Sequence, residues 1–417
     1  MNYVIIIPDG AADEPIDSLD GKTPLAAAHT PHLDRLAKRS IIGRSWNVPD
    51  NLSPGSDVAT LSLLGYNPAE VYTGRAPLEA IAQNIQLGPN DLAFRCNLVC
   101  IEQGTMKSFT AGHISSEEAK EILNTLQSEV APKWNEIAAR LGLNDYVGRV
   151  DFHPGVSYRN LMVFSPQASD SAPFAKTNTY PPHDYTDQQI DQALPAGDGS
   201  TLLREVMEVS ASVLESHPVN RKRIREGKLP ATHAWLWGQG RTPNIVPFAQ
   251  RHPNITSGKM ITAVDLLRGI ARSIGWDIVD VPNITGYIDT DYSAKGRYAA
   301  AKIADNRIVC VHVEATDESG HEGSVAKKIA ALEDIDSKVL PPVLDALAGQ
   351  AHWRILVTPD HPTPVRIKTH SRGFVPWLIA GSDIDVNNPN QTYDEATAEK
   401  SEYHFEHGWE LIDFFLG

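Results

Sequence analysis

The apolar positions at the start of the chain form a short unbroken run. Residues 3–8 are rich in β-branched side chains and end at Asp9, a pattern typical of a fully buried strand in a parallel sheet. Residues 24–40 instead show helical spacing, and Pro31 is expected to divide that segment into two helices. A further helix is predicted over residues 56–65. Strand and helix patterns therefore alternate from the beginning.

The same alternation returns late in the chain. Strands are predicted over residues 234–237, 277–281, 307–313 and 353–358, and helices over residues 263–274, 294–304 and 325–347. Between these two regions the pattern changes to short strand-like runs around one long helix-like stretch at residues 116–141. We therefore predict an α/β protein whose mostly parallel sheet is flanked by helices. Residues 1–90 and 231–417 would form this domain, and residues 91–230 an inserted smaller α/β domain.

Composition and charge narrow the class of protein. The 417 residues include 52 Asp and Glu against 37 Lys and Arg, which gives a formal charge of −15 and argues against nucleic acid or a membrane surface as partner. The first residues lack a basic segment, and their apolar run is too short for a signal peptide or a membrane span, so we expect a cytoplasmic protein. Cys96, Cys100 and Cys310 are expected to be reduced packing residues.

Three predicted buried strands each lead into a carboxylate. Asp9 follows the first strand, Asp317 follows the strand at residues 307–313, and Asp360 follows the strand at residues 353–358. In open α/β sheets, ligands bind outside the carboxyl ends of the strands. The three carboxylates are therefore expected to converge on one site.

Histidines accompany these carboxylates in the sequence, at positions 321, 361 and 370. Carboxylate and imidazole ligands without thiolates suit Zn or Mn better than Ca, and their number exceeds what a single four-coordinate ion needs. Two divalent ions would also balance three carboxylates and one ionised hydroxyl. The hypothesis is a two-metal site built from Asp317, His321, His361, Asp360 and His370 together with Asp9.

Ser56 is the candidate for the hydroxyl. It stands at the predicted start of a helix, where the backbone N–H groups favour an anion, and metal coordination would lower its pKa and make it a nucleophile. The alternative is that Ser56 only caps the helix, as most serines at such positions do.

Several motifs, in this order along the chain, resemble the archaeal-type cofactor-independent (2,3-bisphosphoglycerate-independent) phosphoglycerate mutases of the alkaline phosphatase superfamily. They include Asp9-Gly10-Ala11-Ala12-Asp13, Pro54-Gly55-Ser56-Asp57, Asp317-Glu318-Ser319-Gly320-His321 and Pro359-Asp360-His361-Pro362. The resemblance covers nearly the whole chain. It implies an alkaline-phosphatase-like sheet domain with a second domain inserted.

The resemblance also implies a reaction and its ligands. A metal-bound serine, here Ser56, would take the phosphoryl group of 3-phosphoglycerate and return it to the other hydroxyl of the bound glycerate. The implied cofactors are two divalent ions, Mn first, with Zn, Mg and Co as alternatives. By position, the first ion would be held by Asp9, Ser56, Asp360 and His361, and the second by Asp317, His321 and His370.

Further residues are carried over from shorter motifs. The implied contacts to the substrate's phosphate and carboxylate are Arg95, Asn97, His113 and Arg159. Lys295 is similar to the lysine that neutralises the transferring phosphoryl group. The expected partner is a small phosphorylated acid, phosphoglycerate.

Two other activities stay open at this stage. Residues 235–240 and 405–411 look closer to a bacterial branch of the same family, proposed to act as an ATP-dependent homoserine kinase. A metal-dependent phosphomonoesterase or phosphonate hydrolase would keep the same metals but release phosphate to water. The sequence leaves the physiological metal and the oligomeric state undetermined.

Overall fold

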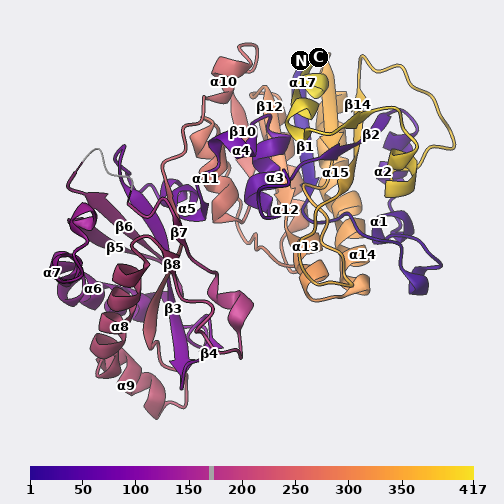
Figure 1. Cartoon of the computed structure of the whole chain (residues 1–417). Coiled ribbons are helices and arrows are strands. Elements are labelled where there is room, and N and C mark those ends of the chain that lie inside the picture. Colours follow the sequence, from indigo (N-terminus) through magenta and orange to yellow (C-terminus); the bar gives the residue numbers. More distant parts are fainter. Residues whose placement is uncertain (169–172) are drawn as a thin grey trace. The chain divides into compact units, whose positions relative to one another are not determined.

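The computed structural model describes residues 1–168 and 173–417, which form two compact units (Figure 1). The first unit comprises Met1–Tyr72 and Asn244–Gly417, and the second comprises Thr73–Pro243. The chain of the first unit is thus discontinuous. Its two breaks lie at residues 72/73 and 243/244, rather than at the expected 90/91 and 230/231.

The first unit is built on an eight-stranded sheet in the order β11-β10-β12-β1-β13-β14-β2-β15. The strands are β1 (Asn2–Pro8), β2 (Ile41–Trp46), β10 (Gly258–Ile261), β11 (Asp277–Ile278), β12 (Ile308–Val313), β13 (Trp353–Val357), β14 (Phe374–Gly381) and β15 (His404–Phe405). All neighbouring pairs are parallel except those that β14 makes with β13 and β2. The predicted mostly parallel α/β sheet is confirmed.

Helices flank this sheet. They are α1 (Pro24–Ala27), α2 (Pro31–Ala37), α3 (Ser56–Leu63), α4 (Pro68–Val71), α10 (Phe248–Arg251), α11 (Asp265–Ser273), α12 (Tyr292–Ile303), α13 (Ala315–His321), α14 (Val325–Asp334), α15 (Leu340–Ala348), α16 (Glu395–Glu399) and α17 (Leu411–Leu416). One face of β1 and β12 packs in a core with α12, α14 and α15. On the other face Tyr3 meets Phe415 of α17 edge to face, with ring centroids 5.3 Å apart.

The second unit has an antiparallel sheet of its own, in the order β4-β3-β6-β5. Strand β9 also pairs with β3, antiparallel to it. These strands are β3 (Leu92–Glu102), β4 (Thr105–Ser108), β5 (Gly148–Val156), β6 (Arg159–Pro166) and β9 (His233–Arg241). A short pair, β7 (Thr177–Asn178) and β8 (Ala196–Gly197), lies apart from it. The helices of this unit are α5 (Arg75–Ala82), α6 (Ser116–Glu129), α7 (Trp134–Arg140), α8 (Ser200–Glu215) and α9 (Pro218–Arg225).

Strand β9 explains the shifted boundaries. The sequence pattern assigned residues 234–237 to the first sheet, and that assignment is wrong, because β9 pairs along β3 in the second unit. Helix α5 also packs on β3 and β9. The strand itself was predictable from its apolar run, but its partner was not.

One of two predicted long helices is divided in the structure. The stretch at residues 116–141 forms α6 and α7, with Pro132 in the 3₁₀ turn between them. The stretch at residues 325–347 is helical throughout, as predicted: α14 continues into α15 through a π-helical segment, Ile335–Val339, which precedes Pro341. At residue 132 the proline removes a backbone donor that a continuous α-helix would need.

The three cysteines are free and buried, as expected for packing residues. Within residues 1–168 and 173–417, no helix combines the length and the apolar character that crossing a bilayer requires.

The centre of the parallel sheet provides a test of this core. Ile355 of β13 is fully buried beside β1, whereas Ile367 is 37% exposed in the same unit. We expect Ile355→Ala to lower the free energy of unfolding by about 3 kcal/mol, because it leaves a cavity in a packed interior. Ile367→Ala should change it by less than about 0.5 kcal/mol. Urea denaturation followed by circular dichroism measures both, and equal losses would contradict the assigned core.

Candidate active site

The three predicted carboxylates lie together at the carboxyl ends of neighbouring strands of the first unit. Strand β1 lies between β12 and β13 and is parallel to both. Asp9 directly follows β1, Asp360 follows β13, and Asp317 lies in α13 directly after β12. The three residues Asp9, Asp360 and Asp317 are almost completely buried, at 0%, 0% and 4% exposure. The parallel register therefore brings residues from distant parts of the sequence into one acidic cluster.

Gly10 permits this close approach. Its φ is +60°, in the left-handed region, and a Cβ there would lie 2.5 Å from both Asp317 Oδ1 and Thr363 Oγ1. Its backbone N–H donates to Asp360 Oδ1 over 3.0 Å. Only glycine lets the chain turn out of β1 while its main chain holds a neighbouring carboxylate.

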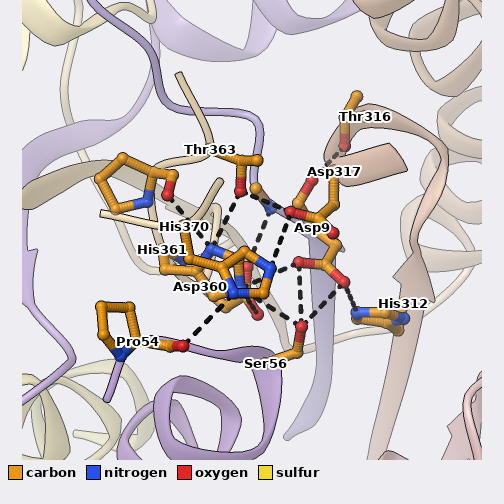
Figure 2. Close-up of polar contacts among 12 residues, drawn as sticks. Asp9, Pro54, Ser56, His312, Thr316, Asp317, Asp360, His361, Thr363 and His370 are labelled. Atoms are coloured by element: carbon orange, nitrogen blue, oxygen red, sulfur yellow. Dashed lines mark hydrogen bonds and ion pairs between the residues drawn. The ribbon is translucent and has the colours of Figure 1, made fainter. Parts of the chain in front are cut away.

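Ser56 is the first residue of α3, and Gly55, not Ser56, is the N-cap. The Ser56 hydroxyl points back to the carboxyl ends of the strands, 3.2 Å from Asp9 Oδ2 and 3.2 Å from His361 Nε2 (Figure 2). The alternative of a simple helix cap is therefore wrong for this serine, because its oxygen engages the acidic cluster rather than the helix.

A second group forms around Asp317. His321 Nε2 lies 3.2 Å from Asp317 Oδ2, and His370 Nε2 lies 3.4 Å from Asp317 Oδ1. The two imidazole nitrogens are 3.0 Å from each other. Their other nitrogens face main-chain carbonyls, of Lys368 for His321 and of Pro54 for His370, which orients both rings toward the carboxylate.

Thr363 links the two groups. Its hydroxyl donates to Asp317 Oδ1 and lies 3.2 Å from His361 Nδ1. The His361 ring is buried, and its Nε2 faces Ser56, Asp9 and Asp360. Thr363 was not singled out from the sequence, although it directly follows the Pro359–Pro362 motif, two residues after His361.

The charges of this cluster are strongly coupled. Burial, followed by the charges of Asp360 and Asp317, raises the pKa of Asp9 well above its usual value. Burial also opposes ionisation of Asp317, but hydrogen bonds from His321 and His370 outweigh it and hold that pKa well below its usual value. Burial lowers the pKa of His321, yet its hydrogen bond to Asp317 prevails and raises it to about 9. Protons thus balance part of the negative charge, and a bound cation would displace them.

The residues fit divalent cations. Three sets of three side chains have ligand atoms within 4.8 Å of one another: Asp317, His321 and His370; Asp9, Asp317 and His361; and Asp9, His312 and Asp360. Asp360 Oδ2 is buried and has no hydrogen-bond partner in the described part of the chain. An orphaned carboxylate oxygen in a dry acidic cluster is the kind of atom that a metal ion satisfies.

His312 is a member of this cluster that the sequence candidates left out. It lies in β12, is fully buried, and its Nε2 is 2.9 Å from Asp9 Oδ2. Burial lowers its pKa to about 3, so the ring is neutral. A lone histidine within the apolar run at residues 308–313, five residues before Asp317, was the available signal.

Lys295 lies in α12 and is completely buried. Its Nζ donates to the main-chain oxygen of His312 over 2.8 Å, next to the acidic cluster. Burial lowers its pKa to about 8, against the opposing charges of Glu314 and Asp9. The structure gives it this backbone partner, and its assigned role toward a phosphoryl group stays a prediction.

Three of the four predicted substrate contacts lie together in the second unit. Arg95 and Asn97 alternate along β3, and Arg159 stands opposite Asn97 on β6. The Arg95 guanidinium pairs with Glu79 over 3.0 Å and lies 4.2 Å above the Trp237 ring, whose Nε1 donates to Asn97. These contacts hold both side chains in fixed positions.

His113 and Arg75 differ from this group. His113 lies outside the strands β3 and β6 that carry the other three, in a turn with φ +52°. Arg75, at the start of α5, was not among the candidates. After burial and the opposing charge of Glu79, the charges of Arg75 and Arg159 further lower the pKa of Arg95, so these three guanidinium groups form one positive cluster.

Comparison with known proteins decides the family. A family model described as 2,3-bisphosphoglycerate-independent phosphoglycerate mutase matches residues 37–220. The chain is 45% identical over 401 residues to the enzyme of that name from Methanosarcina barkeri, covering 96% of this chain and 95% of the relative. The chain belongs to the 2,3-bisphosphoglycerate-independent phosphoglycerate mutase family. The resemblance carried by the metal-site and serine motifs is confirmed.

Solved structures agree with this phosphoglycerate mutase fold. A Pyrococcus horikoshii protein matches with a TM-score of 0.79 and 27% identity, over 100% of this chain and 96% of that one. The cofactor-independent phosphoglycerate mutase of Thermoplasma acidophilum matches with a TM-score of 0.63 and 23% identity, over 100% and 98% of the two chains. The second likeness supports the fold alone.

Metal binding to the acidic cluster should stabilise the protein. We expect Mn²⁺ at 100 times its dissociation constant to add about 2.7 kcal/mol to the free energy of unfolding and to raise the unfolding temperature of the chelator-treated protein by several degrees. Differential scanning calorimetry measures this shift. Asp360→Asn should remove most of it, whereas Asp385→Asn, at an exposed position, should keep it. An equal shift in both variants would show that the ion binds elsewhere.

Proposed function

We propose that this protein interconverts 3-phosphoglycerate and 2-phosphoglycerate through a phosphoserine at Ser56. The observation that carries the proposal is the contact of Ser56 Oγ with both Asp9 and His361 at the N-terminus of α3. The relatives named as 2,3-bisphosphoglycerate-independent phosphoglycerate mutases, matched over nearly the whole chain, support it.

Two divalent ions are part of the proposal, with Mn as the first candidate. Asp9, Ser56, Asp360 and His361 would hold one ion, and Asp317, His321 and His370 the other. When bound, such a pair neutralises negative charge and lowers the pKa of a hydroxyl that it contacts. Oxygen and nitrogen ligands without thiolates suit Mn among the candidate metals.

The chain's own residues account for the two transfers. Ser56 Oγ loses its proton and forms a bond to phosphorus while the bond from phosphorus to the 3-oxygen of glycerate breaks, and that oxygen takes up a proton. The 2-hydroxyl of the retained glycerate then loses its proton and attacks the phosphoserine; the bond from phosphorus to Ser56 Oγ breaks, and Oγ takes up a proton again, so the two steps together consume no proton. Asp9 Oδ2 accepts the hydrogen bond of the Ser56 hydroxyl and is therefore the carboxylate nearest to its proton. No water is consumed, so water must be kept from the phosphoserine.

Side chains with N–H donors would bind the substrate. We assign Arg95, Asn97, His113 and Arg159 to its phosphate and carboxylate; the two guanidinium groups match both anions through paired N–H donors. Burial of Arg95 against Glu79 and Trp237 supports a preorganised donor. Lys295 is assigned to the charge of the transferring phosphoryl group, next to Asp9.

The direct test is an assay with purified protein, Mn²⁺ and 3-phosphoglycerate, without 2,3-bisphosphoglycerate. We expect 2-phosphoglycerate as product, with retention of a ³²P label in the product and little free phosphate. Phosphorus NMR resolves the two phosphoglycerates and inorganic phosphate in one sample.

The same samples test the other two activities. Release of inorganic phosphate as the main product would favour a phosphomonoesterase. Formation of phosphohomoserine from ATP and homoserine, without mutase turnover, would favour the kinase. Either result, or no conversion with Mn, Co, Zn or Mg, contradicts the mutase proposal.

Ser56→Ala should lower kcat by at least about a thousandfold, because it removes the group that forms the covalent intermediate. Ser53→Ala, an exposed serine three residues earlier, is the matched control and should keep wild-type turnover. Both variants should keep the second group of ligands and its ion. Substantial turnover by Ser56→Ala would refute the nucleophile.

A further inference from the structure

His312 is the one buried imidazole of the acidic cluster that the family's proposed ligand set does not use. Its strand, β12, is buried at every position, and the ring lies at the carboxyl end of the sheet beside Asp9 (Figure 2). A buried polar ring in an apolar strand is costly unless its nitrogens are satisfied. Its partners therefore indicate what it does.

One nitrogen of His312 has a structural partner. Nδ1 lies 3.3 Å from Thr262 Oγ1, and both residues are completely buried. Thr262 Oγ1 is itself held by the backbone N–H of Val264 over 3.1 Å. The ring orientation is thus set from the side away from Asp9, in the manner of an outer partner that fixes a ligating imidazole.

The other nitrogen has no hydrogen-bond partner in residues 1–168 and 173–417. Asp9 Oδ2 lies 2.9 Å from Nε2 but outside the direction of an N–H hydrogen bond. Asp360 belongs to the same set of candidate ligands as Asp9 and His312, whose ligand atoms lie within 4.8 Å of one another, and its buried Oδ2 likewise has no hydrogen-bond partner among the described residues. Two members of this set therefore each carry an orphaned buried atom.

A cation explains both orphaned atoms, and a lysine does not. The nearest buried ammonium group, Lys295 Nζ, donates to the main-chain oxygen of His312 rather than to either orphaned atom. A neutral imidazole nitrogen and two carboxylate oxygens are a common ligand set for Zn, Mn or Co.

We propose that His312 is a metal ligand, adding its Nε2 to the first of the two ion sites. This inference rests on the proposed two-metal function. The first ion would then have five protein ligands rather than four. Five exceed the tetrahedral set of structural zinc sites and favour an ion that accepts five or six ligands, such as Mn or Co.

The rival explanation is that His312 only orients Asp9. His312→Gln separates the two roles, because a glutamine amide reaches about as far as Nε2 and can donate N–H to Asp9, but offers no imidazole nitrogen. A merely orienting role would survive this change, whereas a ligand would be lost.

The experiment measures Mn²⁺ binding to the full chain by isothermal titration calorimetry, together with pulsed electron paramagnetic resonance, which detects imidazole nitrogen bound to Mn²⁺. We expect two sites in the wild type. In His312→Gln, one site should weaken at least about tenfold and lose one imidazole nitrogen coupling. His252→Gln is the matched control, since His252 Nε2 is also buried without a partner but lies outside the cluster. It should bind Mn²⁺ as the wild type does.

The outcomes distinguish this inference from the proposed function. A wild type that binds no Mn²⁺ overturns both. Two intact sites and unchanged nitrogen couplings in His312→Gln overturn the role of His312 alone. If His312→Gln does not fold by circular dichroism, Thr262→Val serves instead, because it keeps the imidazole and removes the group that orients it. It should weaken the same site about tenfold, and unchanged affinity overturns the proposal.

Discussion

The rest of the site depends on the burial of three carboxylates in one small volume. Removing a carboxylate from water costs several kcal/mol unless other groups replace the lost hydration. The protein supplies such groups from every side: backbone N–H of Gly10 to Asp360, the Thr363 hydroxyl to Asp317, and imidazoles around both ends of the cluster. These groups offset only part of the negative charge, and the remainder favours the uptake of protons or cations by the cluster.

The parallel sheet brings the three carboxylates together without strain in the backbone segments that carry them. Each carboxylate follows a strand or begins the helix after it, so the backbone that carries it is already fixed by the apolar core. The insertion of Thr73–Pro243 does not divide the ion site, since every one of its candidate ligands lies in the first unit. The guanidinium cluster of Arg75, Arg95 and Arg159 belongs to the second unit. The candidate ion ligands and the guanidinium cluster thus belong to different units of the chain.

The sequence predicted four of the eight strands of the first sheet, β1, β11, β12 and β13, and with them the acidic cluster, because a buried strand that leads into an Asp is a local pattern. It did not predict β2, β10, β14 or β15. The prediction failed for residues whose role depends on which distant residues they contact. The run at residues 234–237 is a strand in either sheet, and only its pairing with β3 assigns it. His312 was missed for the same reason. Its own strand has the pattern of a buried core strand, and only its contact with Asp9 indicates a place in the site. Asp9 lies some 300 residues away in the sequence and is adjacent only through the register of β1 and β12. Arg75 likewise gains significance only from its neighbours in space.

The position of β1 in the sheet has a consequence for how the protein is made. This strand is synthesised before both of its neighbours, β12 and β13, which begin at residues 308 and 353. At about 5–20 residues per second, roughly 15–60 s pass between the synthesis of β1 and that of β12, the earlier of its two neighbours. During this time β1 is an apolar strand with two unpaired edges. The second unit, which is complete at Pro243, can already fold. An unpaired apolar strand edge can pair with a wrong strand, and Ser56 and Asp9 meet the rest of the acidic cluster only after β12 and β13 have been made.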